Sequence, residues 1–213
     1  MPGTKGLSAL VIVGATVGTA SAQLTVFTDR ASWEAALGGA AVFTEDFNAQ
    51  TPGIIADGST LDTGLLQITR NGSPNSGDGL LEIEDGGNFG NLDGTIFLSG
   101  ETGVEPHERV EFGFNGNSVF AFGGDWFSPF SGDGIALDID GELVLLDAVS
   151  GFDSGFIGVV GTSAFGSVAI VGTPDPISFQ ELWSVDNISY AIPTPATAAL
   201  LGLAGLYAAR RKR

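Results

Sequence analysis

Carboxylate side chains are the reactive groups that this chain offers most often. Its 213 residues include 25 Asp and Glu against 8 Lys and Arg, and the formal net charge is −17. Cysteine chemistry is absent because there is no Cys. A zinc site is not expected, because the chain has no thiolate and only one histidine, His107. The excess of negative charge excludes nucleic acid as a partner, because its phosphates would be repelled.

Two acidic stretches predict a metal site. Strand alternation places Glu45 on the same face as its apolar neighbours, and we expect that face to point inward. In a later strand, alternation places Asp186 on the face of Ile188 and Tyr190. A buried carboxylate is costly unless it is paired or bound to metal, and basic residues are scarce here. Oxygen ligands from Glu45, Asp46 and Asp186 suit a structural Ca²⁺. The alternative is a bulge that turns one of these acids outward.

The densest aromatic cluster contains Trp126, Phe127 and Phe130. Aromatic rings exposed at the rim of a β-sandwich can stack on sugar rings, so the cluster predicts a carbohydrate-binding surface. The alternative is core packing at the end of a strand. Trp183 alternates with Val185 and is expected in the core.

Catalytic residues are not assigned. The chain has no Gly-x-Ser-x-Gly elbow for a Ser-His-Asp triad and no Walker-type phosphate loop. A pair of acids for glycoside hydrolysis remains open, but among 25 acids some pair lies at a suitable distance by chance. The prediction is therefore a protein that is not an enzyme.

Short apolar runs broken by Gly, Asn and Asp predict the elements that position these side chains. A helix capped by Thr28 or Asp29 is predicted through Leu37, where Gly38-Gly39 follows. Asp140-Gly141 between two apolar runs predicts a two-residue hairpin. Many short strands at this spacing predict an all-β, jelly-roll-like β-sandwich with one short N-terminal helix. The predicted strands are Leu24–Phe27, Val42–Phe47, Leu65–Arg70, Leu80–Glu84, Thr95–Leu98, Arg109–Phe114, Val119–Gly123, Ile135–Ile139, Glu142–Asp147, Gly155–Val160, Ser167–Val171 and Phe179–Tyr190.

Residues 1–22 have the pattern of a secretory signal peptide. Lys5 gives a positive start, Leu7–Val17 is apolar, and Ala20-Ser21-Ala22 forms a small-residue cleavage site. The mature part, residues 23–191, is long enough for one domain with a real core. It contains all 25 acids and only three basic residues, a difference of −22.

Residues 192–213 carry a second targeting pattern. Pro193-Thr194-Pro195 precedes an apolar run, Ala196–Ala209, and the basic cluster Arg210, Arg211, Lys212 and Arg213. A helix over that run would be about 21 Å long, shorter than the roughly 30 Å of a bilayer core. The basic cluster is expected to stay on the cytoplasmic side.

This tail resembles the PEP-CTERM sorting signal of bacterial exported proteins, with Thr194 where that family usually has Glu. The resemblance implies an exosortase-type sorting enzyme as a partner and transient anchoring in the membrane through the C-terminal helix. It also implies a final location at the cell envelope, the outer surface or the extracellular matrix.

Two inner stretches, Glu45-Asp46-Phe47 and Val185-Asp186-Asn187-Ile188, resemble the first and last strands of jelly-roll modules such as carbohydrate-binding and MAM domains. In such modules the two strands lie side by side, and acids on them often hold a structural calcium. The resemblance therefore implies that the predicted metal ligands come from adjacent strands.

These patterns predict an exported, membrane-sorted surface or matrix protein with a non-enzymatic, carbohydrate-binding β-sandwich. The tail implies association with exopolysaccharide. The alternatives are a glycosidase or lyase acting on that polysaccharide, and a purely structural coat protein. A deep cleft with two facing carboxylates would favour the enzyme, and an exposed aromatic strip would favour sugar binding.

Overall fold

The computed structural model describes residues 23–71, 81–88, 90–102, 109–128, 135–146, 154–172 and 181–193. The predicted signal peptide, the sorting segment from Thr194 onward, His107 and Phe130 lie outside these residues. Within the described part of the chain, no helix is long and apolar enough to span a membrane.

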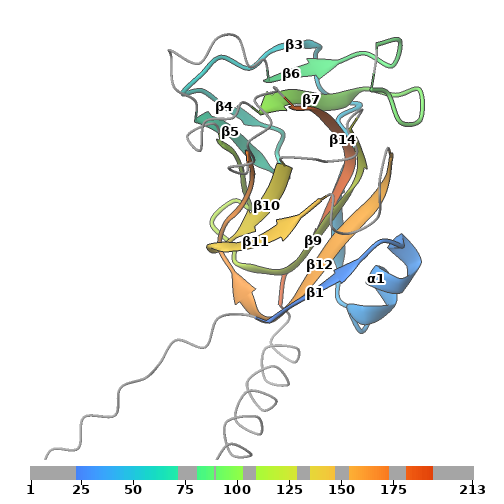
Figure 1. Cartoon of the computed structure of the whole chain (residues 1–213), viewed down its shortest axis with the longest axis vertical. Helices are drawn as coiled ribbons and strands as arrows, with labels where there is room; N and C mark the ends of the chain where they lie inside the picture. The colour runs from blue at the N-terminus through green and yellow to red at the C-terminus, as the bar shows by residue number, and fades with distance from the viewer. Residues whose placement is uncertain are drawn as a thin grey trace, which may run out of the picture.

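Two antiparallel sheets form a sandwich, which confirms the predicted all-β class (Figure 1). Sheet A has the order β1 (Leu24–Phe27), β12 (Ser154–Phe165), β9 (Val119–Phe127), β14 (Glu181–Ala191), β7 (Phe97–Thr102), β6 (Leu81–Glu84) and β3 (Gly53–Ile54), and β2 (Val42–Glu45) also pairs with β14. Sheet B has the order β11 (Glu142–Leu145), β10 (Ile135–Ile139), β13 (Val168–Gly172), β8 (Arg109–Gly113), β5 (Gln67–Asn71) and β4 (Thr60–Asp62).

The core lies between the two sheets and follows the alternation of each strand. Phe122 of sheet A meets Phe112 of sheet B with ring centroids 5.4 Å apart, and both side chains are buried. Ile68, Leu137 and Val185 belong to the same apolar cluster. Burying one face of each sheet against the other leaves the outer faces available for polar side chains.

The only helix of the described residues, α1 (Arg30–Ala36), covers part of the outer face of sheet A beside β12 (Figure 1). Asp29 caps it by accepting from the backbone N–H of Ser32 at 2.8 Å, as predicted. Trp33 is fully buried, and its Nε1 donates to the carbonyl of Val159 at 3.0 Å. A Cβ at Gly158 would come within 2.7 Å of the Trp33 ring, so the helix can sit this close only because β12 has glycine there.

Most predicted strands are confirmed, with ends that shift by a few residues. The hairpin between β10 and β11 turns at Asp140 and Gly141, whose φ angles are 49° and 90°, as a two-residue turn of this type requires. The strands β3 and β4 were not predicted, because two or three residues are too few to show a period.

Candidate functional site

A β-bulge in β14 decides where its acid points. Asp186 lies opposite Asp125 of β9, whereas Ser189 lies opposite Gly123, so β14 has one extra residue between these two pairs. Asn187 takes up that extra residue with a φ of 51°. The insertion reverses the alternation, and Asp186 therefore lies on the outer face of sheet A rather than on the inner face with Tyr190.

Glu45 and Asp186 consequently do not converge, and the prediction that they share one inward face is wrong. Glu45 pairs with Ile188 on the inner face of the sheet and is 5% exposed. Asp186 is also buried, with 1% of its surface exposed, but it lies on the outer face of the sheet. The implied adjacency of the strands is confirmed, because β2 and β14 pair directly.

Each of the predicted calcium ligands accepts hydrogen bonds from the chain. Glu45 accepts from the backbone N–H of Phe47 at 2.9 Å, and the exposed Asp46 accepts from Asn48 at 3.2 Å, which together form a tight turn after β2. Among the described residues, no three Asp, Glu, His or Cys side chains come together as a group that could hold a metal. Calcium binding stays a prediction, without the geometry first expected for it.

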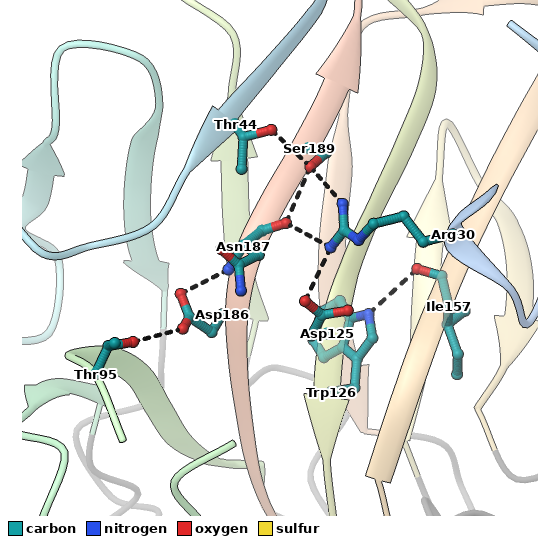
Figure 2. A network of polar contacts seen from close by, with 9 residues as sticks. All are labelled: Arg30, Thr44, Thr95, Asp125, Trp126, Ile157, Asp186, Asn187 and Ser189. Carbon is teal, nitrogen blue, oxygen red and sulfur yellow. Dashed lines mark hydrogen bonds and ion pairs between the residues drawn. The ribbon is translucent and has the colours of Figure 1, made fainter. Parts of the chain in front are cut away.

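Asp186 lies on β14 between the residues that pair with β7 and the residues that pair with β2, near the start of β7 and the end of β2. It accepts from its neighbour Asn187 N–H at 2.6 Å and from Thr95 Oγ1 at 3.1 Å (Figure 2). Burial raises the pKa of Asp186 to about 6, and the nearby carboxylates of Asp93 and Asp125 add to this despite the two hydrogen bonds.

One arginine binds the strands around Asp186 together. Arg30 of α1 forms an ion pair with Asp125 at 3.0 Å and also donates to the carbonyl of Asn187 at 3.1 Å (Figure 2). Its other terminal nitrogen donates to Ser189 Oγ at 2.9 Å. Its guanidinium lies 4.6 Å from the ring centroid of Phe156. We call Arg30, Asp125, Asp186, Asn187 and Ser189 the Arg30 cluster; it fastens α1 to β9 and β14.

The predicted sugar-stacking surface is wrong for Trp126. This residue is 1% exposed, its Nε1 donates to the carbonyl of Ile157 at 3.4 Å, and its ring packs on Trp183 with centroids 6.3 Å apart. Trp126 pairs with Val185, so alternation points it into the core. The expectation that Trp183 is a core residue is confirmed. Phe127 points to the opposite face and is half-buried.

A pocket of about 260 Å³ lies on the outer face at the end of sheet A away from α1, where Figure 1 shows β3, β6 and β7. One row of side chains crosses four strands there, from Glu82 through Ser99 and Ser184 to Phe127. We call this the β6–β7 pocket. Its lining consists of Glu82, Glu84, Asn88, Gly90, Ser99, Gly100, Glu101, Phe127, Leu182, Trp183 and Ser184.

The wall of the pocket is a glycine-rich loop held close to the sheet. Ser184 Oγ donates to the carbonyl of Gly90 at 2.6 Å, and Gly90 has a φ of 91°. At Gly86 an added Cβ would lie 2.1 Å from the carbonyl oxygen of Gly94. The loop can close on itself and on β14 only because these positions lack side chains.

Three glutamates give the pocket its charge. Of the described residues that line it, none is Lys, Arg or His. Partial burial, together with the neighbouring Glu84, raises the pKa of Glu82, while Ser99 Oγ hydrogen-bonds to the carboxylate of Glu84. No protein-family model matches this chain, and no curated protein matches it either.

The pocket was not predicted, although part of its signal is present in the sequence. Leu81, Glu82, Ile83 and Glu84 alternate cleanly, which places both glutamates on one face of the strand. What alternation could not indicate is that the loop after β6 folds back over that face.

Proposed function

We propose that residues 23–191 form a non-enzymatic, carbohydrate-binding β-sandwich of an exported surface protein. The observation that supports this best is the β6–β7 pocket. Its volume of about 260 Å³ lies just below the range of roughly 300–1,000 Å³ for drug-sized ligands, which suits a small unit such as a sugar ring. Carboxylates and serine hydroxyls in its lining can hydrogen-bond sugar hydroxyls.

Phe127 takes the role that was first predicted for the whole aromatic cluster. It stands at one end of the row that crosses the pocket, and its half-buried ring offers an apolar surface beside polar groups. Such a mixed lining is typical of sites that bind a ring with one apolar face and many hydroxyls. Phe130 lies outside the described residues, so we assign no role to it.

The terminal segments complete the proposal. Export through residues 1–22 and sorting by an exosortase-type enzyme through Pro193-Thr194-Pro195 and the basic end would deliver the domain to the envelope or matrix. There, exopolysaccharide is the ligand class that a sugar-binding domain would meet. The support for this step is the sequence pattern of the two ends.

A glycosidase is the second candidate, because the environments of Glu82 and Glu84 differ. A raised pKa suits Glu82 to the role of general acid, and Glu84, which accepts from Ser99, would be the base or nucleophile. Against this role, the two glutamates project from the same side of one strand. Glycosidases instead place their carboxylates on either side of the scissile bond.

The test is a glycan-array screen of the purified full chain and of Phe127→Ala, with product analysis of every glycan that binds. We expect binding without cleavage, and at least tenfold weaker binding by Phe127→Ala. Phe43→Ala is the matched control, because Phe43 is 36% exposed on β2, where it stacks on Tyr190. Cleavage that is lost in Glu82→Gln would establish the enzyme instead, and absence of any binding would favour a structural coat protein.

A further inference from the structure

The segment that begins in the wall of the β6–β7 pocket runs along the outer side of β14. We call residues 90–96 the strap. At its start, Gly90 lines the pocket, and its carbonyl accepts from Ser184 Oγ at 2.6 Å. Near its end, Thr95 Oγ1 donates to Asp186 Oδ2 at 3.1 Å (Figure 2). Two side chains on the same face of β14 therefore fasten the strap to that strand.

The burial of the outer side chains of β14 changes where the strap lies. Leu182, Ser184 and Asp186 follow one another on this face; Leu182 is exposed, whereas the other two are buried. An added Cβ at Gly90 would lie only 3.0 Å from Ser184 Oγ, so the strap approaches the strand closely. The strap covers these two polar side chains and supplies a hydrogen-bond partner to each.

Hydrogen bonds inside the strap join its two ends. The side chain of Asn91 donates to the carbonyl of Thr95 at 2.8 Å and accepts from the N–H of Gly94. Asp93 accepts from the N–H of Thr95 at 2.9 Å and from its hydroxyl at 2.5 Å. Because these bonds connect residue 95 to residue 91, we expect a loss of the attachment at Thr95 to displace Gly90 as well.

We propose that Thr95 and Asp186 are positioning residues for the β6–β7 pocket. Neither of them lines it. Their hydrogen bond holds the strap against β14, and the strap keeps Gly90 in place as part of the wall beside a bound sugar. A wall that is already fixed loses less conformational freedom when a ligand binds, so the attachment strengthens binding. This inference rests on the proposed carbohydrate-binding function and names what keeps its site in shape.

The test compares Thr95→Val with Thr95→Ser in the full chain. Valine removes the hydroxyl and keeps a branched side chain, whereas serine keeps the hydroxyl. Thr69→Val is the matched control, because it removes a hydroxyl that lies 2.8 Å from Thr60 Oγ1 on sheet B, away from the strap. Ser184 is left unchanged, since it lines the pocket and its loss would act on the ligand directly.

The first readout is amide hydrogen exchange, which needs no ligand. In Thr95→Val, the amides of residues 94 and 95 should exchange at least tenfold faster, with much smaller changes in β9 and β12. Thr95→Ser and Thr69→Val should keep the native rates in the strap. Unchanged strap amides in Thr95→Val would overturn the proposal. Equal acceleration in the strap and in β9 would overturn it too, because the hydroxyl would then support only the overall stability.

The second readout is binding to the glycan array, at a temperature where every variant is folded. For each glycan that the native chain binds, Thr95→Val should bind at least fivefold more weakly, whereas Thr95→Ser and Thr69→Val should bind as the native chain does. Equally weak binding by Thr95→Ser would overturn the role of the hydroxyl.

The remaining outcomes separate this inference from the proposed function. Native binding by Thr95→Val, despite faster exchange in its strap, would overturn the positioning role and leave carbohydrate binding standing. If the native chain binds no glycan, the proposed function fails and the positioning role fails with it. The exchange rates then still decide whether the Thr95 hydroxyl holds the strap on β14.

Discussion

The Arg30 cluster and the β6–β7 pocket both place carboxylates on the outer face of sheet A, but among the described residues only the Arg30 cluster contains an arginine. Asp186 is 1% exposed and accepts two hydrogen bonds, and its neighbour Asp125 is paired with Arg30. In the pocket, Glu82 and Glu84 are half-buried beside each other, and none of the described residues that line the space is basic. The ion pair of Asp125 therefore helps to hold the fold, whereas Glu82 and Glu84 are available to a ligand.

Local backbone geometry explains why the two regions differ. The bulge at Asn187 turns Asp186 outward between the parts of β14 that pair with β7 and with β2, and α1 brings Arg30 to the carbonyl of Asn187. At the other end of the sheet, the β6 strand keeps its regular alternation and a glycine-rich loop closes over it. One region is therefore sealed by a helix and the other is only partly covered by a loop.

The largest expected loss of stability is that of replacing Arg30. Arg30→Met leaves Asp125 without its ion pair and removes donors from Ser189 and Asn187, so unfolding should become easier by about 2 kcal/mol. This is less than the roughly 3–5 kcal/mol of a fully buried pair, because both side chains are about one-third exposed. Denaturant titration measures the change. Glu34→Gln, exposed on the same helix, is the control, and an unchanged midpoint for Arg30→Met would show that the cluster contributes nothing.

Asp186 should behave in the opposite sense to Asp125, although the two lie opposite each other. The pKa of Asp186 is about 6 in the folded chain and near 3.8 when unfolded, so the folded state binds its proton more tightly. Stability from this group is fully present below pH 3.8 and is lost as pH rises through 6. About two pKa units correspond to roughly 2–3 kcal/mol, an upper estimate for this site.

The measurement is stability against pH in Asp186→Asn and Asp125→Asn. Asp186→Asn should raise the free energy of unfolding at pH 7 and flatten its dependence between pH 4 and 6. Asp125→Asn should instead lower stability at pH 7, because it breaks the ion pair with Arg30. If Asp186→Asn were destabilising at pH 7 while the pH dependence stayed the same, the ionised carboxylate would be the favoured form and the comparison would fail.

The sequence predicted the strands, the turn and the helix cap better than it predicted the face on which single side chains lie. Alternation in β8, β10 and β6 and the turn at Asp140-Gly141 are local signals, and the structure confirms them. The Asp29 cap and the Trp33 stripe of α1 are local too. Such signals predict the structure correctly because they depend only on residues that are close in sequence.

The failures come from single residues that change a register or from contacts distant in sequence. One extra residue at Asn187 reversed the face of Asp186, and no local pattern marks that bulge. The aromatic neighbours of Trp126 suggest an exposed strip, but its cross-strand partner Val185 shows that it points inward, as the alternative of core packing expects. The pocket depends on the return of a loop over β6, which only the folded chain reveals.

A smaller effect is expected within the pocket. Glu82→Gln should raise the free energy of unfolding by a few tenths of a kcal/mol, because it removes a partly desolvated charge beside Glu84. Glu142→Gln, exposed on β11, should change stability less and serves as the control. Denaturant midpoints at low salt resolve the difference best. A clear loss of stability would indicate that Glu82 is held by the chain, as Asp125 is.

The effect of calcium on stability is also expected to be small. It tests whether the metal binds in the β6–β7 pocket or in the Arg30 cluster. Half-buried carboxylates without an internal cation attract Ca²⁺, whereas the oxygens of Asp186 already accept hydrogen bonds in an enclosed position. When free calcium equals its dissociation constant, mass action stabilises the folded chain by about 0.4 kcal/mol, which is a rise of roughly 1–2 °C in Tm. Thermal melts of the full chain in calcium and in chelator should show this rise. Glu82→Gln with Glu84→Gln should abolish it, and Asp186→Asn should retain it. If Asp186→Asn abolished the rise instead, the metal would belong to the Arg30 cluster, and the division between structural and ligand-binding acids would be reversed.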